Sequence, residues 1–142
     1  MTGDQTDKVT PFLMFQGRAE EAMTFYTSLL EGDEIVHISR YGPQEAGREG
    51  SVEHAVFTLG GRAVMCIDST VEHDFGFTPA MSLYLRCDSE AEIEHLYTDL
   101  SQEGQVLMPL ASYDFSRQFA WVNDRFGVSW QLDLRDEAPG RA

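Results

Sequence analysis

Several kinds of segment are missing from this sequence of 142 residues, and each absence narrows the class of protein. No apolar run approaches the roughly 20 residues that a membrane-spanning helix requires. The opening stretch, MTGDQTDKVT, is polar and does not resemble a signal peptide. We therefore expect a cytoplasmic protein that does not contact a membrane.

Cysteine is also rare. The chain has only Cys66 and Cys87, and they form no C-x-x-C pair of the kind that binds zinc or carries out redox chemistry. Both lie in apolar stretches with the pattern of β-strands. We expect two small, buried side chains in a reducing compartment.

Positive charge is scarce as well. The chain has 10 Lys and Arg against 24 Asp and Glu, which gives a formal net charge of −14. This charge repels phosphate backbones and anionic lipids, so it argues against nucleic acid or a membrane as a partner. The hydrophobic share of 42% is ordinary for a soluble globular domain, and the length suffices for one domain with a sizeable core.

What the sequence does contain is a repeated pattern. AEEAMTFYTSLL begins at Ala19 and AEIEHLYTDLSQ begins at Ala91, and both place apolar residues at helical spacing. Setting Tyr26 on Tyr97 gives an offset of 97 − 26 = 71 residues, half of the 142-residue chain. The sequence therefore predicts that the chain contains two copies of one structural module.

Strand patterns surround each predicted helix in the same order. Gly60 and Gly61 separate two strand-like runs and predict a tight hairpin turn. Gly32 is expected to end the first helix, and Ser89 with Glu92 has the spacing of a capping box at the start of the second. A strand containing Pro109 is expected at a sheet edge or to end there.

These patterns predict an α+β fold of two β-α-β-β-β modules, at about residues 10–68 and 80–134. The ends, 1–9 and 135–142, are expected to be flexible. Neither module alone can bury both faces of its sheet, so we expect one domain over 10–134, with curved mixed sheets around a cleft. Such a cleft is the default ligand site.

Four segments carry a resemblance to a known family, and they read MFQGRAEEAMTFY, FTLGGRAVMCIDS, HDFGFTPAMSLYL and FSRQFAWVNDRFGVSWQL. The paired modules resemble the vicinal oxygen chelate superfamily, which includes glyoxalases, extradiol dioxygenases and bleomycin-resistance proteins. Within it, these segments resemble the PhnB-like branch, often labelled 3-demethylubiquinone-9 3-methyltransferase, over about residues 10–134.

The resemblance implies where a metal would be held. Metal-dependent relatives place His and Glu side chains on the first and fourth strands of each module, where the metal acts as a Lewis acid. The corresponding residues here are Pro11, Cys66, Met81 or Ser82, and Gln131. No carboxylate or imidazole stands among them, so we predict no metal and no other cofactor.

The loop between the modules is a candidate for catalysis. It brings the acid Asp68, the hydroxyl of Ser69 and the imidazole of His73 close together in the sequence. A histidine beside a carboxylate can act as a general base. Alternatively, these side chains cap turns in a polar connector.

The other histidines have simpler interpretations. His37 and His54 lie on predicted neighbouring strands and can face each other. His95 follows Glu92 at E-x-x-H spacing, and we expect a solvated helix face there.

Aromatic residues crowd the second half and favour a flat, apolar ligand. Trp130 and Gln131 should face opposite sides of their strand, with Trp130 in the core. The candidate ligand-binding residues are Gln131, His73, Ser69, Phe75, Phe77, Tyr84 and Trp121.

Four functions follow in order of support. The first is binding of a small, partly aromatic or apolar metabolite without metal. The second is a metal-independent enzyme using Asp68 and His73, and the third is a metal-dependent lyase, isomerase or dioxygenase. The labelled methyltransferase is last, because no Gly-rich turn joins a parallel strand to a helix. The resemblance also implies a homodimer.

Overall fold

The structure is a computed structural model that describes residues 7–135. The chain divides into two compact units, unit 1 up to Asp74 and unit 2 from Phe75. The predicted modules fall one in each unit. Most of the predicted flexible ends, 1–9 and 135–142, lies outside the described residues.

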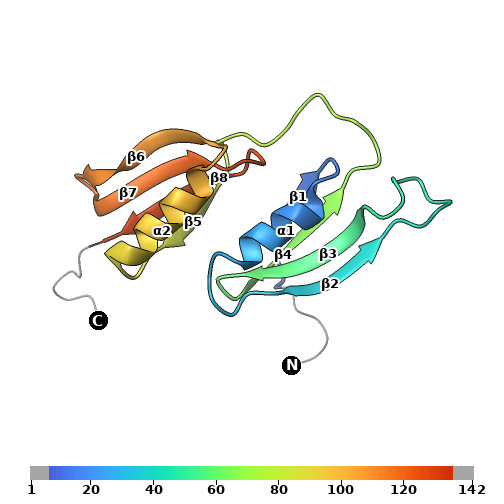
Figure 1. Cartoon of the computed structure of the whole chain (residues 1–142), viewed down its shortest axis with the longest axis horizontal. Coiled ribbons are helices and arrows are strands. Elements are labelled where there is room, and N and C mark those ends of the chain that lie inside the picture. The colour runs from blue at the N-terminus through green and yellow to red at the C-terminus, as the bar shows by residue number, and fades with distance from the viewer. Residues whose placement is uncertain (1–6, 136–142) are drawn as a thin grey trace. The chain divides into compact units, whose positions relative to one another are not determined.

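Each unit has the order β-α-β-β-β, which confirms the predicted α+β class and the two similar modules (Figure 1). Unit 1 contains β1 (Phe12–Phe15), α1 (Ala19–Thr27), β2 (Ile35–Arg40), β3 (Val52–Leu59) and β4 (Arg62–Asp68). Unit 2 contains β5 (Ser82–Arg86), α2 (Glu90–Ser101), β6 (Gln105–Tyr113), β7 (Ser116–Asn123) and β8 (Ser129–Leu134). Each unit forms a four-stranded sheet, ordered β1-β4-β3-β2 in unit 1 and β5-β8-β7-β6 in unit 2.

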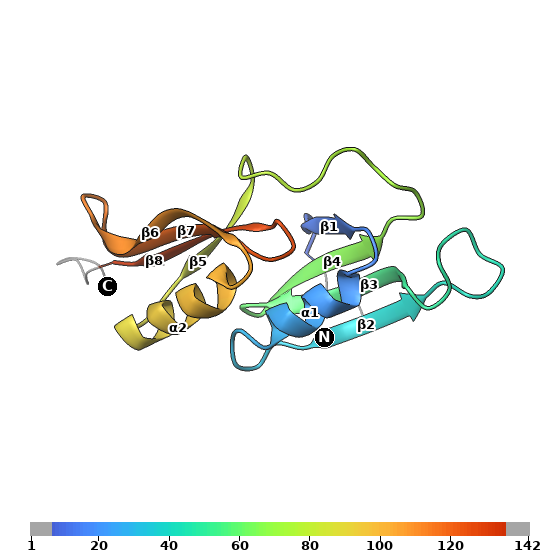
Figure 2. The same ribbon diagram turned by 45° about the horizontal axis from the view of Figure 1, so that its top comes forward.

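In unit 1, α1 lies on one face of the sheet (Figure 2). Its apolar residues Ala19, Ala22, Met23 and Tyr26 are buried. The ring centroids of Tyr26 and Phe57 lie 6.1 Å apart across this contact. α1 ends at Thr27 rather than at the predicted stop, Gly32. The helical hydrogen-bond pattern changes there, because the Ser28 N–H donates to the Phe25 carbonyl, three residues earlier, at 3.1 Å.

The predicted hairpin turn between β3 and β4 is confirmed. Gly60 and Gly61 have φ angles of 59° and 81°, in the left-handed region that glycine adopts readily. The carboxylate of Asp33 accepts both of their N–H groups, at 2.8 and 3.0 Å. This glycine pair therefore turns one antiparallel strand into the next and does not lead into a helix.

In unit 2 the expected start of α2 is confirmed. The Glu92 N–H donates to the Ser89 hydroxyl at 3.1 Å, and the Glu92 carboxylate accepts the Asp88 N–H at 2.7 Å. Pro109 lies within β6, which is an edge strand, as one of its two predicted placements required. No helix in residues 7–135 is long and apolar enough to cross a membrane.

Candidate ligand-binding site

The sheet of unit 2 has one face that α2 covers and a second face with polar and aromatic side chains. Trp130 on β8 is 1% exposed, which confirms it as a core residue, and its indole N–H donates to the Asp124 carboxylate at 2.9 Å. Because strands alternate, Gln131 points to the other side. We call this second face the unit 2 open face. The residues in register on this face of β5, β7 and β8 include Ser82, Tyr84, Arg86, Trp121, Ser129, Gln131 and Asp133.

Hydrogen bonds order the centre of the unit 2 open face. The Gln131 amide donates to the Ser82 hydroxyl at 2.8 Å, and the Trp121 indole N–H donates to the Ser129 hydroxyl at 2.8 Å. Tyr84, in register with Gln131, is 54% exposed. Three of the predicted ligand-binding residues, Gln131, Tyr84 and Trp121, therefore share one face.

The second-module residues do not fit the divalent metal that the family resemblance implies. The candidate positions hold Met81 or Ser82, and Gln131, all of which are neutral, and Ser82 and Gln131 already bind each other. A hard divalent cation prefers carboxylates and several oxygen ligands. Across residues 7–135, no group of three or more His, Cys, Asp or Glu side chains is placed to hold a metal ion.

On the fourth strand of the first module, the position assigned to Cys66 from the sequence is wrong by one residue. Cys66 is fully buried, and strand alternation puts it on the same face as Asp68, which binds the start of α1. Met65 and Ile67, on either side of Cys66 in the sequence, occupy the opposite face of the sheet. Neither side chain can act as a ligand for a hard cation. Burial first, and the nearby Asp68 second, raise the pKa of the Cys66 thiol to about 12.

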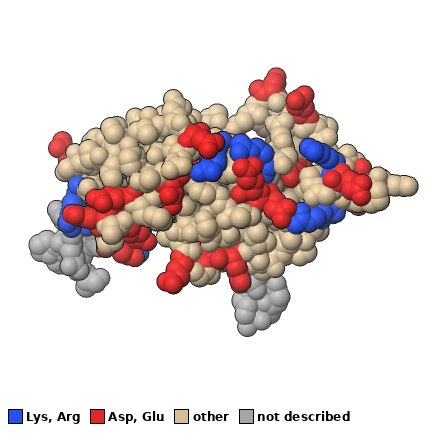
Figure 3. Space-filling model, in the orientation of Figure 1, with Lys and Arg blue, Asp and Glu red and all other residues tan. Residues whose placement is uncertain are grey.

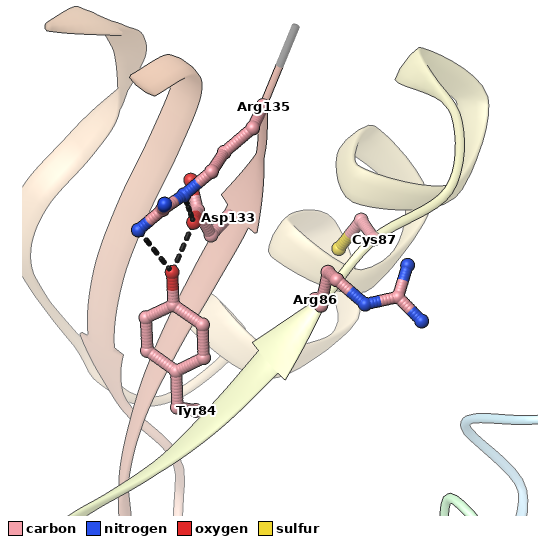
Figure 4. Close-up of a pocket in the computed structure, with 5 residues that line it drawn as sticks. All are labelled: Tyr84, Arg86, Cys87, Asp133 and Arg135. Atoms are coloured by element: carbon pink, nitrogen blue, oxygen red, sulfur yellow. Dashed lines mark hydrogen bonds and ion pairs between the residues drawn. The ribbon is translucent and has the colours of Figure 1, made fainter. Parts of the chain in front are cut away.

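A buried carboxylate lies at one end of the unit 2 open face. Asp133 is 1% exposed, and its two oxygens accept hydrogen bonds from the hydroxyls of Tyr84 and Ser116 and from Arg135 Nε, the last at 2.7 Å. Arg135 Nη2 also donates to the Tyr84 hydroxyl at 3.4 Å (Figure 4). Burial raises the pKa of the Asp133 carboxyl, but these hydrogen bonds outweigh it and lower the pKa overall. The side chain is therefore a carboxylate at neutral pH.

A pocket of about 380 Å³ lies at this end of the sheet, and we call it the Arg86–Arg135 pocket. Its lining residues are Tyr84, Arg86, Cys87, Asp133 and Arg135. Burial, with smaller contributions from acidic neighbours, raises the pKa of the Cys87 thiol to about 12. The thiol stays protonated at neutral pH, so Cys87 is not suited to act as a nucleophile.

Asp68, a predicted catalytic residue, is occupied by backbone contacts. It is 2% exposed, and its carboxylate accepts the N–H groups of Gly17, Ala19 and Val52 at 2.8 to 3.0 Å. Gly17 and Ala19 flank Arg18, the N-cap of α1, whose own side chain does not cap the helix. Asp68 therefore caps α1 from a distant strand.

The structure brings the other two loop candidates together. Ser69 Oγ lies 2.9 Å from His73 Nε2 and donates to the Val71 carbonyl at 2.8 Å. The His73 backbone N–H donates to the Gln16 side chain at 3.3 Å. These bonds match the turn-capping interpretation, and the general-base role of His73 stays a prediction.

The remaining candidates lie elsewhere. Phe75 is exposed. Phe77 lies beside Gly127, in the turn between β7 and β8. The rings of His37 and His54 do face each other, with centroids 6.1 Å apart. His95 is exposed on α2 and lies 3.1 Å from Asp99, as a solvated helix face predicts.

The sequence interpretation missed Asp133 as a site residue. Asp68 and Asp133 end the two 15-residue segments that align between the modules, but strand register places them on opposite faces of their sheets. Asp68 shares the helix-covered face with Cys66 and caps α1, whereas Asp133 lies on the unit 2 open face and binds side chains at the pocket. The two turns that lead into the last strands differ in length, 60–61 in unit 1 and 124–128 in unit 2, so alignment of the sequence alone does not reveal this difference.

Comparison with known proteins places this geometry in a family. The family model described as 3-demethylubiquinone-9 3-methyltransferase matches residues 7–133. The chain belongs to this family. It is thus a PhnB-like member of the vicinal oxygen chelate superfamily, as the sequence motifs indicated.

Relatives of this family share the fold over nearly the whole chain. A PhnB protein of Bacillus cereus is 59% identical, with a TM-score of 0.89, and the match covers 90% of this chain and 99% of that one. Protein YjdN of Escherichia coli K12 is 21% identical over 145 residues, which is 92% of this chain and 97% of YjdN. The fosfomycin resistance protein FosX of Listeria monocytogenes, 7% identical, covers 92% and 94% with a TM-score of 0.61, and shows the fold alone.

Proposed function

We propose that this protein binds a small, partly aromatic or apolar metabolite on the unit 2 open face, without the metal of the superfamily. One observation carries the proposal. The hydrogen-bonded pair of Gln131 and Ser82 lies at positions that the family resemblance assigns to metal ligands, beside the exposed ring of Tyr84 and the half-buried ring of Trp121. Neutral polar groups at these positions suit hydrogen bonding to a ligand better than metal coordination.

The chemistry of this face suits a flat ligand. An aromatic or apolar group can stack on Tyr84 or Trp121, which supplies most of the buried area. The Gln131 amide and the Ser82 hydroxyl each offer both donors and acceptors, so a polar substituent can be oriented there. Apolar area with a few placed polar groups is the usual composition of a small-molecule site.

The methyltransferase activity in the family description is not part of this proposal. Enzymes that use S-adenosylmethionine usually hold it at a Gly-rich turn after a parallel strand. The Gly60–Gly61 pair instead joins the antiparallel strands β3 and β4. Fold-level similarity is in any case a weak basis for assigning a reaction.

A thermal-shift screen tests the proposal. The protein, kept in a chelator, is heated with a panel of aromatic and dicarbonyl metabolites, and we expect a binder to raise the melting temperature. Gln131→Leu and Trp121→Leu should each lose most of the shift. Gln44→Ala, which removes an exposed amide from a loop of unit 1, serves as the matched control and should keep it.

Two results would count against the proposal. One is a shift that appears only with added divalent metal and disappears in Gln131→Leu. The other is consumption of the ligand, measured by chromatography, since turnover supports an enzyme. Loss of that turnover in His73→Ala would assign the reaction to the Ser69–His73 loop.

A further inference from the structure

The Arg86–Arg135 pocket stands out because of its charge. The whole chain has only 10 Lys and Arg against 24 Asp and Glu, and acidic side chains are spread over the face of the molecule shown in Figure 3. Two of those ten basic residues nevertheless line one pocket. The volume of about 380 Å³ is within the range of small-molecule sites, roughly 300–1,000 Å³.

The side-chain groups in this pocket that can still form hydrogen bonds to a ligand are almost all donors. The acceptor oxygens of Asp133 already bind Ser116, Tyr84 and Arg135. A guanidinium has five N–H groups, and Arg135 directs its Nε and Nη2 at Asp133 and Tyr84. The Nη1 group of Arg135 therefore remains to donate to a ligand.

Arg86 can add a second guanidinium. Its Cα is in register with that of Asp133, so it belongs to the same end of the sheet. In Figure 4 its guanidinium points away from Tyr84, and Nη1 donates to Asp88 at 2.8 Å. Both of these side chains are largely exposed, and an exposed ion pair contributes only about 0–1 kcal/mol, so Arg86 can turn into the pocket at little cost.

We propose that the Arg86–Arg135 pocket binds a carboxylate or phosphate group of the metabolite, while the aromatic part lies on Tyr84. The planar fork of a guanidinium pairs with two oxygens of such an anion. Asp133 fixes Arg135 and Tyr84 in place, so this side of the pocket is ordered before the ligand arrives, and Arg86 turns toward the ligand afterwards. This inference rests on the proposed function, because Tyr84 belongs to both the pocket and the unit 2 open face.

Isothermal titration calorimetry with four probes tests the inference. The probes are benzoate, phenyl phosphate, the neutral benzamide, and acetate, in low salt with a chelator. We expect at least one aromatic anion to bind about tenfold or more tightly than benzamide, since charge-assisted hydrogen bonds are the stronger kind. The tighter of benzoate and phenyl phosphate identifies the anionic group.

Arg86→Gln is the main variant, because Arg86 is exposed and its loss should not disturb folding. It should weaken binding of the anion roughly tenfold and leave benzamide unchanged. Arg62→Gln removes an exposed arginine paired with Asp7 in unit 1, and should change neither. Arg135→Gln is informative only if its melting temperature matches the parent, since it leaves Asp133 buried without a cation.

The outcomes separate the two proposals. Equal affinity for benzoate and benzamide, or full affinity in Arg86→Gln, overturns the anion pocket but leaves aromatic binding intact. Binding of acetate as tight as that of benzoate supports the anion pocket and overturns the aromatic part of the proposed function. If none of the four probes binds, the anion pocket is overturned.

Discussion

Asp68 offers the sharpest test of how the fold is held together. Its carboxylate accepts three backbone N–H groups, those of Gly17, Ala19 and Val52, and it is 2% exposed. Asp68→Ala would leave these donors without a partner in the interior. We expect unit 1 to be strongly destabilised and α1 to lose its cap.

The magnitude follows from the bonds lost. A hydrogen bond to a charged group contributes about 1.5–3 kcal/mol, and a helix cap about 0.5–2 kcal/mol. These contributions overlap at Asp68, so we expect Asp68→Ala to lower the free energy of unfolding by roughly 3–5 kcal/mol. Asp68→Asn keeps one acceptor oxygen but places its NH₂ group against a backbone donor, so about 2–3 kcal/mol is expected.

Urea unfolding followed by far-ultraviolet circular dichroism measures this loss. Ser89→Ala, which removes the side-chain cap of α2, is the matched control and should cost about 1 kcal/mol. An Asp68→Ala variant no less stable than Ser89→Ala would refute the capping role. An Asp68→Asn variant with parental stability but no turnover of a substrate would make Asp68 catalytic.

Three further predictions follow from burial and close packing. Burial raises the pKa of both thiols, Cys66 and Cys87, to about 12, so a thiol reagent at pH 8 should modify neither until urea unfolds the protein; fast labelling of the native protein would contradict this. Folding lowers the pKa of the Asp133 carboxyl, so this carboxylate stabilises the folded state at pH values above the ordinary Asp pKa of about 3.9. That contribution to the free energy of unfolding is lost as the pH falls through the lower pKa of the folded protein. The stability gap between the parent and Asp133→Asn in urea titrations should therefore shrink below about pH 4, and a constant gap would argue against a native carboxylate. Finally, a Cβ on Gly104 would lie 2.1 Å from the Asn123 carbonyl oxygen, so Gly104→Ala should cost about 1–3 kcal/mol, whereas Gly76→Ala meets open space and should lower the melting temperature far less.

Features encoded by neighbouring residues were predictable from the sequence. The turn at Gly60–Gly61, the capping of α2 by Ser89 and the opposite orientations of Trp130 and Gln131 all depend on spacing within a few residues. The repeat of the pattern 71 residues later then predicted the second module. Local periodicity is a direct physical constraint on helices and strands, so these inferences were sound.

Features that depend on long-range register were not predictable. A slip of one residue reverses the face of a strand, and that is how Cys66 was placed on the wrong side of β4. Tyr84 and Asp133 are 49 residues apart and meet because β5 and β8 pair in parallel. Nothing near Asp133 in the sequence indicates this partner, or shows that Asp68 would instead cap a helix.

The central claim is that the unit 2 open face binds an organic ligand without metal. Heteronuclear NMR in a chelator tests it most directly, with the Gln131 side-chain amide and the Trp121 indole N–H as reporters. We predict that a ligand found by thermal shift moves both signals, while the indole signal of the buried Trp130 changes less. Movement that requires an added divalent cation, or that spares both reporters, would contradict the account.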